Sequence, residues 1–242
     1  MELDFQPAET FRGTTILRQA QNLAYAYETS HAAADADGAP NAYHPGDLGK
    51  HALKDAHVGL DALANAGYPN TDWWDSVLAA DPHDPSRPYV QQGGATKGFF
   101  VAMTALRKPG GASHDIATYV DSTRVPYVVI PTGFQKLPHV AKMGDVGLAT
   151  DRASGRTTEF IVADAGGGSD AKLGEASLSL YAALGYAGIN PRTGKGLPQT
   201  PIQYLLFPGS RRAGSGIWPR SNDDIAAQVQ ELLASTPGIS LL

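Results

Sequence analysis

Cysteine is absent from this 242-residue chain. Its absence excludes thiol catalysis, disulfide bonds and cysteine-ligated zinc sites. Charged residues are also few, at 18% of the chain, and the net charge is only -5. Because a nucleic-acid-binding surface needs a basic face, we expect no nucleic acid partner. A small negative charge is compatible with a neutral or a cationic substrate.

Long apolar runs are missing as well, and none approaches the roughly 20 residues of a membrane-spanning helix. We therefore expect no membrane partner. The N-terminal stretch MELDFQPAETFRG lacks the basic segment and the apolar run of a signal peptide. Neither a repeat nor a linker divides the chain, so we expect one domain over residues 1–242, and we expect it to be a monomer.

Glycine and proline are abundant, with 27 and 17 residues, and apolar residues make up 42% of the chain. This composition is typical of a turn-rich, mainly β protein with peripheral α-helices. The spacing of apolar residues predicts amphipathic helices over about 9–28 and about 222–234, the second capped by Asn222. Apolar and β-branched runs predict extended segments at 98–104, 118–121, 127–130, 144–150, 157–163 and 202–207.

The stretch from Thr157 to Gly185 is predicted to form a strand, a glycine-rich turn and a short helix. Asp164 ends the apolar strand, three glycines at 166–168 make the chain turn, and Glu175 begins the helix. A carboxylate thus stands at each end of one tight connection. Two carboxylates held together are the minimum equipment for general acid/base hydrolysis of a glycosidic bond.

A second group of carboxylates lies in the segment DADGAPNAYHP, residues 35–45. Asp35 and Asp37 are spaced like the start of a calcium loop, but the bidentate glutamate that ends such a loop is missing. An Asx-type turn is therefore the favoured interpretation. A third interpretation is that one of these aspartates faces an active site, where Tyr43 and His44 would contact a sugar.

The adjacent tryptophans Trp73 and Trp74 cannot both face the core from one side of a helix or strand, so we expect one to be exposed. An exposed tryptophan near a cleft is a stacking surface for a sugar ring, and a half-buried core tryptophan is the equally weighted alternative. The histidines have no metal-binding spacing such as H-E-x-x-H. We expect neither a metal nor another cofactor.

Seven motifs occur in a fixed order over roughly residues 31–210, and together they resemble glycoside hydrolase family 75, the fungal-type chitosanases and their bacterial relatives. A series in order is far more specific than any single motif. The motifs are DADGAPNAYHP, GLDALANAG followed by WW, GFFVAMTAL, YVD with VPYVVIP, GDVGLA, IVADAG with KLGEASLSL, and YLLFPGS.

The resemblance implies endo-hydrolysis of β-1,4 glucosaminidic bonds in chitosan with inversion, on a six-stranded barrel of double-psi type. The barrel core would span about 31–210. The family's two essential carboxylates correspond to Asp164 and Glu175. The connection between them is shorter than in fungal members, and the cysteines near the fungal aspartate-rich motif are absent, which bears on loop geometry and substrate preference.

The resemblance leaves the roles of the carboxylates open. Glu175 is the candidate general acid and Asp164 the candidate base, but a helix N-terminus would lower the pKa of Glu175 and make it a poorer acid. Asp35 or Asp37 is the alternative base. A cleft that binds glucosamine should be acidic, and Asp121 is a candidate substrate contact on that ground.

Two further functions stay open at this point. The first is hydrolysis of another amino-sugar polymer, such as the glycan of peptidoglycan. The second is a carbohydrate-binding barrel without hydrolytic activity. The resemblance also implies a secreted protein, although no signal peptide is visible in the chain.

Overall fold

A nine-stranded mixed sheet organises the fold in the computed structural model, which describes residues 2–49 and 57–240. The hydrogen-bonded order is β2-β3-β4-β12-β9-β10-β8-β11-β5. Antiparallel pairs join the strands from β2 to β10, whereas β10 runs parallel to β8 and β11 runs parallel to β5. The strands are β2 (Gln6–Phe11), β3 (Thr14–Arg18), β4 (Tyr25–Thr29), β5 (Ala33–Asp35), β8 (Tyr127–Pro131), β9 (Val146–Asp151), β10 (Thr157–Gly166), β11 (Glu175–Ser177) and β12 (Ile202–Phe207).

Two small ribbons and two α-helices accompany the sheet. The strand β1 (Glu2–Leu3) pairs with β13 (Ile239–Ser240), and β6 (Ala80–Asp81) pairs with β7 (Asp84–Pro88). The α-helices are α1 (Leu178–Ala183) and α2 (Asn222–Ser235). Short 3-10 helices lie at 64–67, 74–76, 116–118, 134–136 and 214–216. None of the helices in the described part of the chain is long and apolar enough to cross a membrane.

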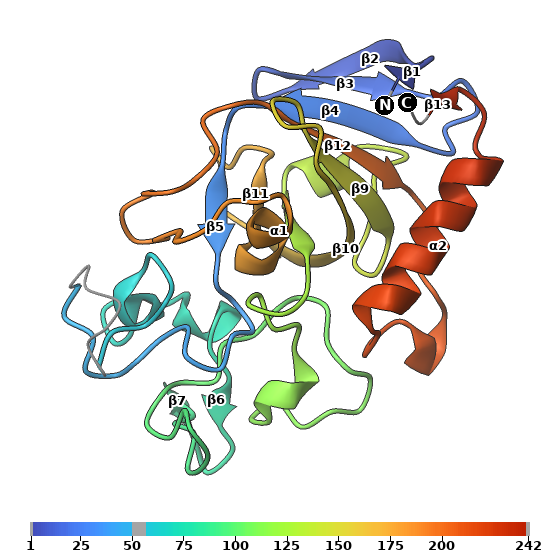
Figure 1. Cartoon of the computed structure of the whole chain (residues 1–242). Coiled ribbons are helices and arrows are strands. Elements are labelled where there is room, and N and C mark those ends of the chain that lie inside the picture. Colours follow the sequence, from blue (N-terminus) through green and yellow to red (C-terminus); the bar gives the residue numbers. More distant parts are fainter. Residues whose placement is uncertain (1, 50–56, 241–242) are drawn as a thin grey trace.

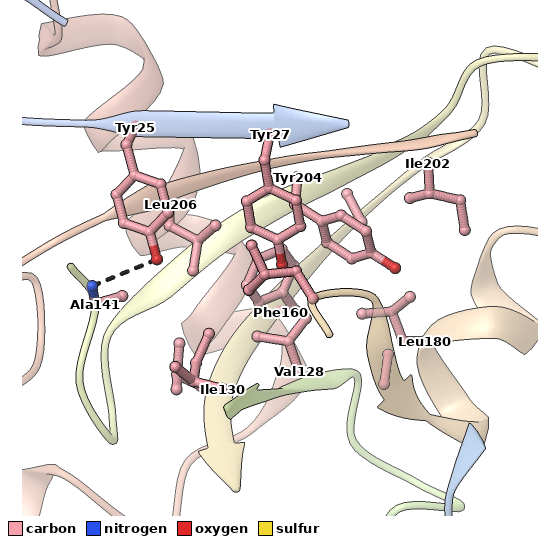
Figure 2. Packing of buried hydrophobic residues seen from close by; sticks show 14 of the residues in the cluster. Tyr25, Tyr27, Val128, Ile130, Ala141, Phe160, Leu180, Ile202, Tyr204 and Leu206 are labelled. Atoms are coloured by element: carbon pink, nitrogen blue, oxygen red, sulfur yellow. Dashed lines mark hydrogen bonds between the residues drawn. The ribbon is translucent and has the colours of Figure 1, made fainter. Parts of the chain in front are cut away.

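The central strands are buried on both faces, so their residues alternate between two apolar clusters. In β10, Phe160 and Val162 face one cluster, and Ile161 and Ala163 face the other. The strands β8 and β12 alternate in the same way. Figure 2 shows the first cluster, where aromatic rings from β4, β10 and β12 pack together with aliphatic side chains from β8 and α1. Continuous burial explains why these strands read as near-continuous apolar runs.

The second cluster is closed by α2, which lies along the flank of the sheet (Figure 1). Its buried residues are Ile225, Val229 and Leu233, spaced four apart on one face of the helix. The Ser221 side chain caps the helix by accepting the N–H of Asp224. The predicted helix at 222–234 is confirmed, but its cap is Ser221 and Asn222 is already helical.

Residues 36–49 and 57–125 form a largely irregular lobe below the sheet (Figure 1). Its own cluster is built mainly from small residues around Tyr43, Leu78 and Phe100. The strand predicted at 98–104 is wrong: Phe100 and Ala102 make only isolated bridges, to Val90 and Leu78. The run is apolar because it is buried between loops, and not because it lies in a sheet. Of the segment 118–121, only Tyr119 forms a bridge.

The amphipathic helix predicted over 9–28 is also wrong, because this segment holds β2, β3 and β4. Arg12 and Gly13 turn the chain with φ of 50° and 85°, which begins a hairpin where a helix would need to continue. Tyr25 and Tyr27 lie two residues apart on one face of β4 and stack on the core. Ala26 between them faces the other cluster, so the buried residues of this segment alternate with the period of a strand.

The remaining strand predictions are confirmed. The segments at 144–150 and 157–163 form the hairpin β9–β10, and 127–130 and 202–207 form β8 and β12. A closed six-stranded barrel is not formed by the pairings of the described residues, whose sheet runs in open order from β2 to β5. The chain is mainly β with few helices, as the sequence predicts.

Candidate active site

Asp164 lies near the end of β10, at a bulge in its pairing with β8. Val162 pairs with Val128, but Asp164 pairs with Val129, so one extra residue stands on the β10 side. A bulge changes the direction in which the following side chains point, and bulges are common beside active sites. Without it, Asp164 would lie beside Ile130. The bulge thus fixes which way the Asp164 carboxylate faces.

Glu175 is held by the short strand β11, which lies between β8 and β5. It pairs with Ala33, while Ser177 pairs with Asp35 at the end of β5. Gly174 precedes Glu175 with φ of 113°, and a Cβ there would lie 2.1 Å from the carbonyl oxygen of His31. Only glycine permits this close approach of the chain to β5. The strands β10, β11 and β5 therefore supply three carboxylates, of which Asp164 and Glu175 stand at neighbouring positions on the two sides of β8.

Two aspartates of the irregular lobe, Asp37 and Asp61, complete the group. Asp37 is tied to β5, because the Asp35 carboxylate accepts its N–H at 2.7 Å, which is the predicted Asx-type turn. Asp61 accepts the N–H of Ala36 at 3.2 Å. The Tyr43 hydroxyl is within hydrogen-bonding reach of both Asp37 and Asp61. We call the five carboxylates the acid cluster: Asp35, Asp37, Asp61, Asp164 and Glu175.

Asp61 is a member of the acid cluster that the sequence pattern does not indicate. The signal available was an aspartate in the motif GLDALANAG, but nothing in the sequence places it 25 positions away against Ala36. Arg192 fixes its main chain, donating from Nη1 to the Asp61 carbonyl oxygen at 2.9 Å. The same guanidinium makes a bidentate pair with Asp47 at 2.7 and 3.0 Å. Both side chains of this pair are almost fully buried, at 1% and 0% exposed.

Burial is the largest cause of the altered pKa values in the acid cluster. It raises the pKa of Asp164 to about 6, against hydrogen bonds from the N–H groups of Ala105 and Ala165, both at 2.8 Å, and from Asp35. Such donors favour the ionised form. Asp164 therefore has donors that favour a negative charge, as does Asp61, which accepts the N–H groups of Leu63 and Ala36.

The pKa of Glu175 rises to about 7, first because of burial and then because Asp164 and Asp61 are negative. The predicted helix start at Glu175 is wrong: Ser177 is the cap and α1 begins at Leu178. The helix dipole acts within the first turn of a helix, which lies beyond Glu175. The objection that a helix N-terminus would keep Glu175 ionised is thereby removed.

The other three members are shifted in the same direction. Burial raises the pKa of Asp35, Asp37 and Asp61, and for Asp35 and Asp37 the nearby carboxylates add to the effect. Oxygens of these three residues lie within 4.8 Å of one another, so they could hold a hard cation. Calcium takes 6–8 oxygen ligands, and the three carboxylates would supply only part of that set.

The predicted sugar-contacting residues are not all placed alike. Tyr43 is buried and supports the acid cluster. His44 packs against His57 and Phe99, with ring centroids 4.9 and 4.8 Å away.

The tryptophan pair is divided as predicted. Trp73 is 40% exposed, whereas Trp74 packs edge-on against Tyr68 at 5.4 Å. Trp73 is thus the available stacking surface.

Asp121, the remaining candidate contact, lines a cavity of about 570 Å³ together with Gly38, which follows Asp37 directly.

Asp37 and Glu175 are partly exposed, and the other three members of the acid cluster are buried. Two cavities of about 570 Å³ lie beside the loops that support the acid cluster, one at Gly38 and one at Ala105, but none of the five carboxylates lines either cavity.

A scan against models of protein families found no match to this chain, and a search of curated proteins found no relative.

Proposed function

We propose that the protein is a glycoside hydrolase that cleaves β-1,4 glucosaminidic bonds within chitosan chains, with inversion. The observation that carries the proposal is the placement of Glu175 and Asp164 on the two strands that flank β8, where Asp164 pairs with Val129 and Ala176, next to Glu175, pairs with Val128. Their environments differ: Asp164 accepts the N–H groups of Ala105 and Ala165 at 2.8 Å, whereas the pKa of Glu175 is raised by burial and by the negative charge of Asp164. Pairs of titratable groups whose environments differ in this way identify an acid and a base. The ordered motifs that resemble glycoside hydrolase family 75 support the same two residues.

In this mechanism Glu175 is the general acid. Its protonated carboxyl donates a proton to the glycosidic oxygen as the bond from that oxygen to the anomeric carbon breaks. Asp164 is the general base. Its carboxylate removes a proton from a water molecule, whose oxygen bonds to the anomeric carbon from the opposite face. Each turnover consumes one water and returns the two carboxyls to their starting states after proton exchange with solvent.

Asp35 has a supporting role in the proposal. Its carboxyl is hydrogen bonded to Asp164 and lowers the pKa of that group. Burial and the neighbouring carboxylates raise the pKa of Asp35 well above its ordinary value, so in the proposal Asp35 is the partner that donates the proton of this hydrogen bond. A protonated Asp35 helps to keep Asp164 ionised. Asp35 and Asp37 as the base are therefore the weaker alternatives.

The charge of the site favours a cationic polymer. Burial, neighbouring carboxylates and hydrogen bonds are the leading causes that shift the pKa values of the acid cluster, and no lysine or arginine of the described residues is among these leading causes. Glucosamine units carry a positive charge at the pH where these carboxylates begin to ionise, so their binding would offset carboxylate repulsion. Peptidoglycan glycan lacks that charge and is the second candidate substrate.

The double-psi type barrel is also part of the proposal, and it is supported by the curvature of the sheet between β10 and β5. Asp35 of β5 and Asp164 of β10 are hydrogen bonded although β8 and β11 lie between their strands in the sheet order. Four flat neighbouring strands would span about 14 Å, so the sheet must curl here. Such curling supports a double-psi type barrel, as the resemblance implies. Secretion and a monomeric state likewise remain predictions.

The test measures cleavage of fully deacetylated chitosan by viscosity and reducing ends, and the anomer first released by proton NMR. We expect endo-cleavage with an α product, and no cleavage by Glu175→Gln or Asp164→Asn with unchanged circular dichroism. Near-full activity in either variant would contradict the site. Cleavage of purified peptidoglycan but not chitosan would favour the second substrate. Binding without product would favour the carbohydrate-binding alternative.

A further inference from the structure

A cavity of about 570 Å³ lies where three segments meet: the turn at Gly38–Pro40, the loop 116–125 and the N-terminus of α2. Its volume is within the range of about 300–1,000 Å³ that small-molecule sites occupy. The turn is held in place by a close approach, because a Cβ on Gly38 would lie 2.1 Å from the carbonyl oxygen of Val120. The cavity wall therefore begins one residue from Asp37 of the acid cluster.

Two hydrogen-bond donors of the cavity wall lack acceptors. Arg220 and Trp218 both line the cavity, and Nη1 of Arg220 and Nε1 of Trp218 are buried without a partner. The Arg220 side chain is only 2% exposed, and Trp218 is 6% exposed. An unsatisfied buried donor costs about 1–3 kcal/mol. Two such donors at one cavity indicate a ligand that supplies acceptor oxygens.

The charges around the cavity favour a neutral acceptor over an anion. Arg220 already pairs with Asp224, through Nε to the carboxylate at 2.8 Å and Nη2 to the carbonyl oxygen at 3.1 Å. Asp121 also lines the cavity and balances the exposed Arg124. The site thus offers spare N–H groups without spare positive charge, which suits a carbonyl oxygen.

Asp121 adds the complementary group. Its Oδ1 accepts the N–H and the hydroxyl of Thr123, at 2.9 and 2.7 Å, and among the described residues no donor reaches its Oδ2. The cavity therefore combines two free N–H donors with one carboxylate acceptor. An acetamido group matches this set, because its carbonyl accepts while its N–H donates.

We infer that this cavity binds the acetamido group of an N-acetylated sugar unit. The inference rests on the proposed function for its ligand class, a partly acetylated amino-sugar chain. The acid cluster would attract glucosamine units, and the neighbouring cavity would select an N-acetylglucosamine unit of the same chain. A glucosamine ammonium cannot accept a hydrogen bond, so it would leave both donors unpaired. Because protein atoms cover these donors, binding must be accompanied by a small movement of the wall.

The test follows the indole N–H of Trp218 by NMR in the ¹⁵N-labelled full chain, which has three tryptophans. Trp218→Phe assigns the signal, and the single variants Trp73→Phe and Trp74→Phe assign it by elimination should the first not fold. N,N′-diacetylchitobiose is compared with chitobiose, which differs only in lacking both acetyl groups. We expect a saturable shift of the Trp218 signal with at least tenfold tighter binding of the acetylated sugar.

Arg220→Lys supplies the second measurement, because it keeps the charge beside Asp224 and removes the Nη1 donor. We expect at least fivefold weaker binding of N,N′-diacetylchitobiose, with the Trp218 signal of the free protein retained. Equal affinity for the two sugars, or a shift confined to the Trp73 signal, overturns the inference. The titration reads binding and not cleavage, so its failure leaves the Glu175 and Asp164 test intact, and failure of that test leaves this one interpretable.

Discussion

The Asp35 carboxyl is hydrogen bonded to Asp164 across a sheet in which two strands separate them. This contact lowers the pKa of Asp164, which burial raises to about 6. The alternative base considered from the sequence is thus a partner of the proposed base. In the proposed mechanism Asp35 donates a hydrogen bond to Asp164. Variants that keep or remove a donor at position 35 test whether this hydrogen bond, and not the volume of the side chain, affects Asp164.

Asp35→Ala removes the donor to Asp164, so we expect the pKa of Asp164 to rise. The acid limb of the pH profile of kcat/KM should then move to higher pH by roughly 0.5–1 pH unit. Asp35→Asn keeps an N–H donor of similar shape and should restore the limb toward its original position. The measurement is the pH dependence of chitosan cleavage. A lower kcat/KM with an unmoved acid limb in Asp35→Ala would show that Asp35 only fills space.

The sequence was sufficient for the parts of this site that local pattern controls. The apolar run ending at Asp164 and the short helix after Gly174 are local features, and both were predicted to within a few residues. The split of Trp73 and Trp74 followed from adjacency alone. These predictions held because neighbouring residues determine them.

Tertiary contacts decided what the sequence did not predict. Ile16, Ala20, Leu23 and Tyr27 have helical spacing, yet Leu23 is 49% exposed and the core is reached by Tyr25 and Tyr27 from a strand. The β-branched residues before Ile16 and the turn at Arg12–Gly13 favour a hairpin, and this local preference prevails over the helical spacing of the four apolar residues. The place of Asp61 depends on Arg192, which lies 131 residues away.

The exposed tryptophan gives a prediction with an internal control. Trp73→Ala should raise KM for long chitosan chains about tenfold with little change in kcat, because stacking binds ground state and transition state alike. Trp74→Ala should instead lower the free energy of unfolding by about 2–3 kcal/mol, since Trp74 packs on Tyr68 in the core of the lobe. Kinetics on polymer and urea unfolding separate the two. An unchanged KM in Trp73→Ala would remove Trp73 from the binding surface.

The pair Arg192–Asp47 predicts a coupled loss of stability. Arg192→Met should lower the free energy of unfolding by about 3–5 kcal/mol, because it leaves the Asp47 carboxylate buried and unpaired. The double variant Arg192→Met with Asp47→Leu should recover much of that loss, since no charge is then left without a partner. Urea unfolding at pH 7 measures both. A double variant as unstable as the single one would mean that the main-chain contacts to Gly59 and Asp61 carry the effect.

The raised pKa of Glu175 predicts that the proposed active site costs stability at neutral and alkaline pH. The folded chain holds the Glu175 proton up to about pH 7, whereas the unfolded chain loses it near the ordinary value of 4.5. Between these values the folded state binds more protons, so its stability falls as the pH rises through this window. Glu175→Gln removes the titration. We expect it to be more stable than the native chain above pH 7, by up to about 3 kcal/mol, and to differ little from it near pH 4.

Thermal or urea unfolding across pH 4–8 measures the difference in stability between Glu175→Gln and the native chain, and Asp223→Asn, on the exposed first turn of α2, is the matched control. A stability difference between Glu175→Gln and the native chain that does not grow with pH would show that Glu175 is not held protonated by the fold, and would leave the general acid without its source of a proton.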